Sequence, residues 1–182
     1  MPRYVAFLRA INVGGHTVKM DHLRRLFEKL GFANVETFIA SGNVIFDSRS
    51  KNTTALEKKI EKHLEQELGY AVSTFIRSPD ELAAITQYQP FAPSDLNTGD
   101  HTLYVGFVAA EPGAKAKQGL VSLANKVDDF RVNGREVYWL CRKKFSESEI
   151  TPALLAKTLG MPTTLRNITT VRKLAGKYSV HG

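Results

Sequence analysis

The order in which strand-like and helix-like segments follow one another in the first 76 residues constrains the fold more than any other feature of this sequence. Four segments have the apolar, alternating character of strands: residues 4–9, 34–39, 44–46 and 71–76. Two segments place apolar residues at helical spacing: residues 19–30 and 53–68. The resulting order, β-α-β-β-α-β, is the ferredoxin-like pattern.

The ends of the predicted helices carry consistent local signals. Three helices end with Leu, Gly and an apolar residue, at Gly31, Gly69 and Gly160. Glycine just past a helix adopts the left-handed conformation without a Cβ clash, so each triplet predicts a helix end. A capping box, from Ser78 to Glu81, predicts the start of a further helix that ends near Gln87.

The second half of the chain repeats the pattern of the first half. Strands are predicted at 102–109, 129–132, 136–141 and 163–165, and helices at 114–126, at 152–159 and after Asn167. Asn133 and Gly134 predict a tight hairpin turn. We therefore predict an α+β protein in three parts: a ferredoxin-like subdomain with an extra capping helix at 1–88, a Pro-rich linker at 89–101, and a second α+β subdomain of similar β-α-β-β-α-β pattern at 102–182.

Composition narrows the class of protein and its partners. The lone cysteine, Cys141, excludes an internal disulfide and a Cys-based zinc site. Neither a signal peptide nor an apolar run of about 20 residues is present, so we expect a cytoplasmic protein without a membrane partner. Residues 131–182 hold ten Lys and Arg against three Glu, which supplies the whole net charge of +7. This excess indicates either a surface for nucleic acid or a solvated basic face.

One candidate site lies at an edge of the first predicted sheet. In the β-α-β-β-α-β pattern, the loop after the first strand and the turn between the second and third strands meet at the same edge. That edge would carry Arg9, Asn12, Gly14, Gly15, Ser41, Gly42 and Asn43. A guanidinium, two amides, a hydroxyl and backbone N–H groups suit an anionic or polar ligand. The alternative interpretation is that Gly and Asn only form the turns.

A second candidate site is formed by Arg166 and Asn167, just before the terminal helix. The helix N-terminus favours an anion there, while Asn167 also suits a plain N-cap.

The sequence shows no pattern typical of a catalytic or metal site. The five histidines lack the spacing of metal ligands, and no nucleophile elbow, acid or base can be named. Catalytic residues therefore stay unassigned, and no metal or cofactor is expected. The basic and aromatic start of the RNP1 motif is missing, which disfavours RNA binding on the sheet face.

Several motifs of the sequence belong together: the run from Leu8 to Gly15, the triplet Ser41-Gly42-Asn43, and the pairs Thr163-Thr164 and Arg166-Asn167. With these motifs the sequence resembles the bacterial domain-of-unknown-function family 1697. This resemblance implies a ferredoxin-like N-terminal part, a second α+β part and candidate positions that coincide with the two sites above. It implies no activity. The sequence has Ile168 where the family usually has an aromatic residue, and its loop after Gly15 is shorter than in many members.

Three functional hypotheses follow from the sequence. The first is binding of a small polar or anionic ligand, such as a phosphate-bearing molecule, at the edge site, joined by Arg166 and Asn167. The second is non-specific nucleic-acid binding through the basic C-terminal part, which would weaken steeply with salt. The third is an enzyme that acts on a small anionic substrate at the same edge.

Overall fold

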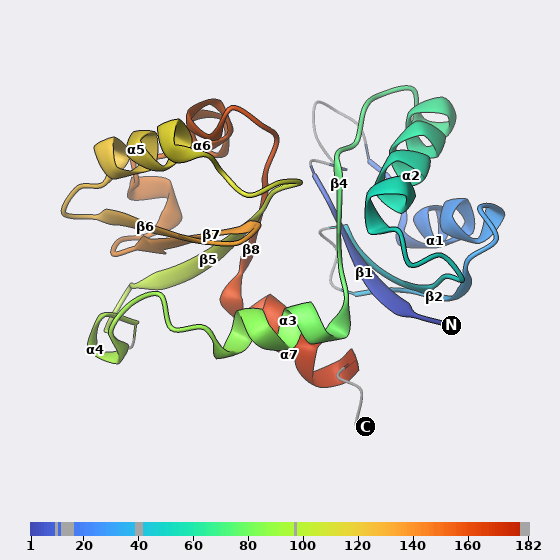
Figure 1. Ribbon diagram of the computed structural model, residues 1–182, viewed down its shortest axis with the longest axis horizontal. Helices are drawn as coiled ribbons and strands as arrows, with labels where there is room; N and C mark the ends of the chain where they lie inside the picture. Colours follow the sequence, from blue (N-terminus) through green and yellow to red (C-terminus); the bar gives the residue numbers. More distant parts are fainter. Residues whose placement is uncertain (10, 12–16, 39–41, 97, 179–182) are drawn as a thin grey trace. The chain divides into compact units, whose positions relative to one another are not determined.

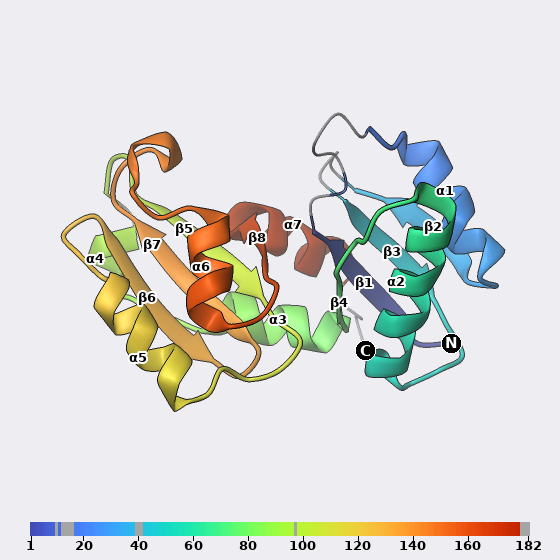
Figure 2. The same cartoon turned by 90° about the horizontal axis from the view of Figure 1, so that it is seen from above.

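The computed structural model describes residues 1–9, 11, 17–38, 42–96 and 98–178, which form two compact units, Met1–Glu81 and Leu82–Gly182 (Figures 1 and 2). Each unit is built on a four-stranded antiparallel sheet with helices. The predicted α+β class and the two similar β-α-β-β-α-β patterns are confirmed. In the described part of the chain, no helix combines the length and apolar character needed to cross a membrane.

The first unit follows the predicted ferredoxin-like order. Its elements are β1 (Arg3–Leu8), α1 (Met20–Lys29), β2 (Ala33–Thr37), β3 (Asn43–Asp47), α2 (Thr53–Leu68) and β4 (Thr74–Arg77), and α3 (Pro79–Gln87) begins at its end. The strand order in the sheet is β2-β3-β1-β4, so β3 lies between β2 and β1. The loop after β1 and the turn before β3 therefore meet at one edge of the sheet.

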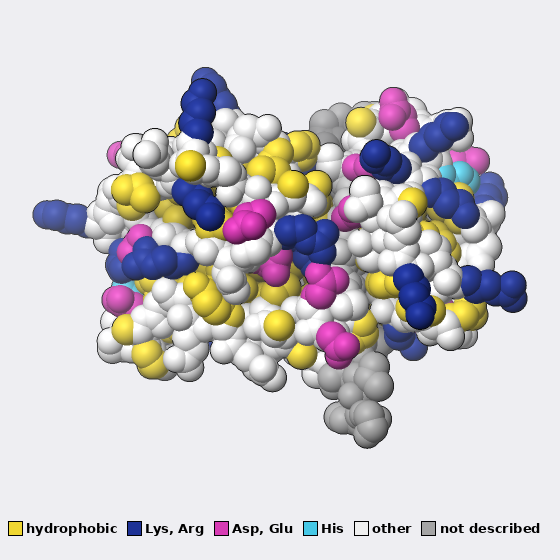
Figure 3. Space-filling view, viewed as in Figure 1, with side chains coloured by type: hydrophobic (Ala, Val, Ile, Leu, Met, Phe, Trp, Pro, Cys, Tyr) yellow, Lys and Arg dark blue, Asp and Glu magenta, His cyan; other side chains and the backbone are white. Residues whose placement is uncertain are grey.

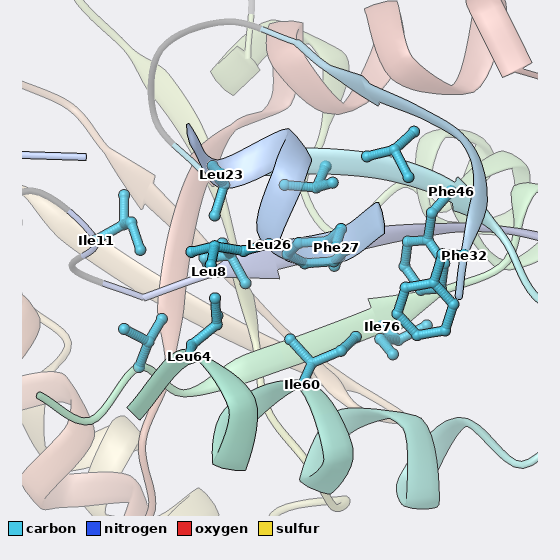
Figure 4. Packing of buried hydrophobic residues seen from close by; sticks show 14 of the residues in the cluster. Leu8, Ile11, Leu23, Leu26, Phe27, Phe32, Phe46, Ile60, Leu64 and Ile76 are labelled. Carbon is cyan, nitrogen blue, oxygen red and sulfur yellow. The ribbon is translucent and has the colours of Figure 1, made fainter. Parts of the chain in front are cut away.

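The core of the first unit lies between the sheet and the helices α1 and α2, as Figure 4 shows. Phe27 of α1 and Ile60 of α2 are fully buried there against Phe46 of β3. On the strands, the side chains that alternate with this core are buried as well, for example Val5 and Phe7. Both faces of the first sheet are therefore apolar.

Two glutamates of α2 bind the backbone of the edge strand β4. The Glu57 side chain accepts a hydrogen bond from the Ile76 amide at 2.9 Å, and Glu61 accepts one from the Thr74 amide at 3.0 Å. Along β4, these two amides alternate with the amides that face β1, so they point away from the sheet. The two carboxylates therefore accept the hydrogen bonds that a further strand would otherwise accept. Glu57 is buried, whereas Glu65 lies on the exposed face of the same helix.

Glu61 makes the stability of the first unit depend on pH. Burial raises the pKa of its carboxyl above the ordinary value of 4.5, although the Thr74 amide and Lys58 act in the opposite direction. A carboxyl with a raised pKa in the folded state favours folding below its unfolded pKa, and this contribution is lost as pH rises through the folded pKa.

We therefore expect wild type to lose stability relative to Glu61→Gln as pH rises from about 4 to 7, because glutamine keeps an acceptor for Thr74 without a charge. Urea unfolding at several pH values measures this difference. Glu65→Gln, on the exposed face of the same helix, is the matched control and should show no such trend. A constant difference between wild type and Glu61→Gln across this range would contradict the assignment.

The second unit repeats the plan with additions. Its elements after α3 are α4 (Pro93–Leu96), β5 (Thr102–Phe107), α5 (Ala114–Leu123), β6 (Asp128–Asn133), β7 (Glu136–Cys141), a 3₁₀ turn (Phe145–Glu147), α6 (Pro152–Leu159), β8 (Thr164–Asn167) and α7 (Ile168–Tyr178). The strand order is β6-β7-β5-β8, and α7 packs on β5 and β8. The segment 89–101, predicted to be a linker, carries α4.

Asp128 holds a buried hydrogen-bond network in the second unit. Its carboxylate accepts hydrogen bonds from Trp139 Nε1 and Ser148 Oγ, both at 2.9 Å, and from Asn125 Nδ2 at 3.3 Å. Only 1% of Asp128 is exposed, and Trp139 is fully buried. The network joins the start of β6 to β7 and to the segment that follows the 3₁₀ turn, so one carboxylate fixes three parts of the chain.

Most of the local signals read from the sequence correspond to observed structure. Ser78 Oγ accepts a hydrogen bond from the Glu81 amide, and Glu81 accepts one from the Ser78 amide, both at 3.1 Å, which confirms the capping box. Gly31, Gly69 and Gly160 all have positive φ at helix ends. The predicted hairpin is present, but its turn is shifted by one residue: Asn133 pairs with Glu136, and Gly134, with φ of 60°, begins the turn. Glycine takes this place because the first residue of such a turn needs positive φ.

The two units place similar sequences at the same positions of their sheets. Residues 4–7 of β1 read Tyr-Val-Ala-Phe, and residues 104–107 of β5 read Tyr-Val-Gly-Phe. In the first unit Val5 pairs with Arg77 of β4, and in the second Val105 pairs with Arg166 of β8. Both arginines are buried. Each guanidinium donates to the carbonyl oxygen of the preceding residue at 2.9 Å. The repetition thus extends from topology to an equivalent buried arginine.

Candidate functional site

At the edge of the first sheet, the loop after β1 and the turn before β3 are in direct contact. The Leu8 amide donates to the Gly42 carbonyl oxygen at 2.9 Å. A Cβ placed on Gly42 would lie 3.1 Å from Ile11 Cγ2 and 3.2 Å from Leu8 Cβ, and the φ of this glycine is 81°. Glycine is required here both for the backbone conformation and for the close approach of the two segments.

Asn43 closes the turn between β2 and β3. It is fully buried, and its Nδ2 donates to the Phe38 carbonyl oxygen at 2.9 Å. In return the Phe38 amide donates to the Asn43 carbonyl oxygen at 3.0 Å. Asn43 therefore has a structural role in the turn, which supports the turn-forming interpretation for this residue.

Arg9 stands beside this contact, directly after β1. Its backbone amide donates to the Ser73 carbonyl oxygen at 2.9 Å, which ties the start of the loop to the segment before β4. The Arg9 side chain is half-buried. Within the described ranges its guanidinium makes no hydrogen bond or ion pair.

The loop after Arg9 is anchored from the other side by Tyr70. The Tyr70 hydroxyl donates to the Ile11 carbonyl oxygen at 2.8 Å, and burial raises the pKa of this phenol. The hydroxyl therefore stays protonated as a donor at neutral pH. Four further members of the predicted site, Asn12, Gly14, Gly15 and Ser41, lie outside the described residues, and their part in the site stays a prediction.

The second candidate site, formed by Arg166 and Asn167, lies in the second unit. Arg166 is 7% exposed, and its Nη1 donates to Thr164 Oγ1 at 2.7 Å and to the Leu165 carbonyl oxygen at 2.9 Å. Burial lowers the pKa of this guanidinium to about 10, so it is still charged at neutral pH. Asn167 Oδ1 accepts from the Thr169 amide at 2.9 Å and thus caps α7. A ligand role for either residue stays a prediction.

Sequence reasoning did not find a cleft of about 540 Å3 in the second unit. Its walls come from the segment after α3, from α4, from the start of β5 and from the start of α7, where Asn167 is one of the lining residues. The prolines and turn formers of residues 89–101 are typical of a linker, and nothing in their pattern indicates the wall of a cleft.

The basic residues of the C-terminal part are partly neutralised by ion pairs. Arg131 pairs with Asp129 at 2.8 Å, Arg142 lies 3.7 Å from Asp129 and 3.9 Å from Asp95, and Arg166 is buried. On the face shown in Figure 3, Lys and Arg side chains are scattered and acidic side chains stand among them.

The surroundings of Cys141 do not favour a nucleophilic thiolate. Cys141 is buried, its Sγ donates to the Lys143 carbonyl oxygen at 3.2 Å, and burial, aided by the Asp128 charge, raises the pKa of the thiol. A raised pKa keeps the thiol protonated, which is the opposite of what a nucleophile needs. The described part of the chain holds no group of three or more His, Cys, Asp or Glu side chains that could bind a metal ion.

Comparison with known proteins agrees with the fold and the motifs described above. A solved structure with the same fold, "The structure of conserved bacterial protein SP0830 from Streptococcus pneumoniae", is 24% identical with a TM-score of 0.68, over 96% of this chain and 97% of that one. No curated protein matches the sequence. A family model described as "Protein of unknown function (DUF1697)" matches residues 1–138. Since this match spans most of the chain and includes the edge motif, the chain belongs to the DUF1697 family.

Proposed function

We propose that the chain binds a small anionic ligand, such as a phosphate-bearing molecule, at the edge of the first sheet. The observation that carries the proposal is the half-buried Arg9 guanidinium, available for a ligand, beside the tight contact between Gly42 and Leu8. A planar guanidinium can bind a phosphate or carboxylate through two parallel hydrogen bonds.

The backbone around Arg9 is held in place before any ligand arrives. Leu8 is bonded to Gly42, the Arg9 amide to Ser73, and Ile11 to Tyr70. A fixed backbone lowers the entropic cost of ordering a binding site and so leaves more of the interaction energy for affinity. In this proposal the predicted residues Asn12, Gly14, Gly15 and Ser41 would add amide, hydroxyl and backbone N–H donors around the anion.

Substitution of Arg9 tests the proposal. Charge-assisted hydrogen bonds contribute about 1.5–3 kcal/mol, so Arg9→Ala should weaken binding of pyrophosphate or a nucleotide about 10- to 100-fold. Isothermal titration at physiological salt measures the dissociation constant. Arg24→Ala, which removes an exposed arginine from α1, is the matched control and should bind like wild type. Equal dissociation constants for the two variants, or no binding by wild type, would refute the proposal.

Non-specific nucleic-acid binding through residues 131–182 is the second candidate function. It is favoured by the adjacent exposed side chains of Lys143 and Lys144, directly after β7. The same titration with a mixed-sequence oligonucleotide tests it, because each neutralised phosphate releases counterions and affinity falls with rising salt. Affinity that does not change with salt would exclude this mode of binding.

A further inference from the structure

We infer that the cleft of the second unit is a separate binding site for a small organic anion, and that Arg172 and His101 recognise its charged group. This inference does not depend on the proposed function, because the cleft and the Arg9 site share no residue and belong to different units. The ligand class is a phosphate monoester or a carboxylate joined to an uncharged polar body.

The size and composition of the cleft suit such a ligand. Its volume of about 540 Å3 lies within the range of about 300–1,000 Å3 that is usual for small-molecule sites. Aromatic and aliphatic side chains line part of it, including Tyr88 and Leu103, and amide side chains line another part, including Gln87 and Gln89. The lining thus pairs apolar surface with polar groups that can orient a ligand.

The described residues that line the cleft carry positive charge, on Arg172, and no negative charge. Arg172 and His101 are its basic residues, and no Asp or Glu is among the described residues that line it. The acidic residue of α4, Asp95, directs its carboxylate toward Arg142, at 3.9 Å. The Arg172 side chain is exposed, and its guanidinium makes no hydrogen bond or ion pair with the described residues, so it can bind an anion in the cleft.

His101 is held in an orientation that leaves one ring nitrogen for a ligand. Its Nδ1 lies within hydrogen-bond distance of the Asp95 carbonyl oxygen, which can only accept, so Nδ1 carries the proton. Nε2 is then the nitrogen available to a ligand, as an acceptor from a hydroxyl or, in the protonated ring, as a donor to an anion. His101 can therefore contact either a hydroxyl of the uncharged part of the ligand or, in its protonated form, the charged group.

The walls of the cleft are formed in advance. Tyr88 packs against Tyr138 with ring centroids 5.0 Å apart. The His101 amide donates to the Thr98 carbonyl oxygen at 3.0 Å, and this hydrogen bond forms a turn in the segment after α4. The first turn of α7 also borders the cleft, and its backbone N–H groups and dipole add to the preference for an anion.

The test uses the full chain and two matched variants of α7. Arg172→Ala should weaken binding of ribose 5-phosphate, AMP or citrate at least 10-fold, as measured by isothermal titration. Lys173→Ala removes the same charge from the next residue, which does not line the cleft, and should change the dissociation constant less than twofold. Ribose 5-phosphate and citrate distinguish a phosphate from a carboxylate ligand.

Hydrogen exchange locates the bound ligand independently of affinity. The ligand should slow amide exchange in residues 86–96 and 167–172 of wild type. No binding by wild type, or equal loss of affinity in Arg172→Ala and Lys173→Ala, would overturn the inference. Loss of binding in Arg9→Ala with full binding in Arg172→Ala would support the proposed edge site and overturn this one, whereas the reverse result would support the cleft alone.

Discussion

Replacing Asp128 with alanine is expected to lower the free energy of unfolding by about 3–5 kcal/mol, because the change leaves the buried Trp139 Nε1 and the half-buried Ser148 hydroxyl without their acceptor. Trp139 Nε1 and Ser148 Oγ both donate to Oδ1 of this carboxylate at 2.9 Å, and Trp139 is fully buried, so water cannot take the place of the carboxylate there. Each orphaned buried donor costs about 1–3 kcal/mol.

Urea unfolding followed by Trp139 fluorescence measures this loss, since this is the one tryptophan of the chain. Asp129→Ala is the matched control: its carboxylate pairs with Arg131 and Arg142 on a partly exposed surface, where an ion pair contributes about 0–1 kcal/mol. Asp128→Asn should fall between the two, because asparagine keeps one acceptor oxygen. Equal losses for Asp128→Ala and Asp129→Ala would contradict a stabilising role for the network.

Replacing Gly42 with alanine is expected to cost about 2–4 kcal/mol. Part of this cost, about 1–2 kcal/mol, is the left-handed backbone, with φ of 81°, which an L-residue adopts with strain. The remainder comes from crowding, because the new Cβ would lie 3.3 Å from the Leu8 carbonyl oxygen and 3.1 Å from Ile11. The backbone atom cannot move aside without disturbing β1.

Gly69→Ala separates the two contributions to this cost. Gly69 also has a left-handed backbone, with φ of 85°, but nothing lies within 4 Å of its added Cβ, so only the conformational cost applies. Thermal unfolding of both variants should therefore show a clearly larger loss for Gly42→Ala. Equal losses would mean that the loop after β1 moves freely away from the turn, which would also remove the structural basis of the edge site.

Features that depend on local chemistry could be predicted from the sequence. The reciprocal hydrogen bonds of Ser78 and Glu81 depend on neighbours three residues apart, and the helix end at Gly69 depends on one backbone conformation. The hairpin between β6 and β7 was predicted for the same reason, although its turn begins one residue later. Such signals act within a few residues and need no knowledge of the rest of the fold.

Features that depend on distant parts of the chain could not be predicted in the same way. The buried Glu57 follows a leucine of the helix just as the exposed Glu65 does, and only the position of β4 gives the Glu57 carboxylate its partner, the Ile76 amide. Likewise, β8 extends to Asn167 because this residue pairs with Tyr104, sixty-three positions earlier in the chain. The cleft beside α7 needs four separate segments to meet, and of these only the start of α7, at Asn167, was singled out from the sequence.

The occupied amides of β4 have a consequence for how copies of this chain behave at high concentration. Exposed strand edges act as templates on which other molecules add strands and form aggregates. A strand arriving at β4 would have to displace the carboxylates of Glu57 and Glu61 from Ile76 and Thr74. At the opposite edge, β2 is interrupted by a register shift between Ala33 and Glu36, and such an irregularity disfavours pairing with an added strand. Both edges of the first sheet, at β4 and at β2, therefore disfavour pairing with a strand of another molecule.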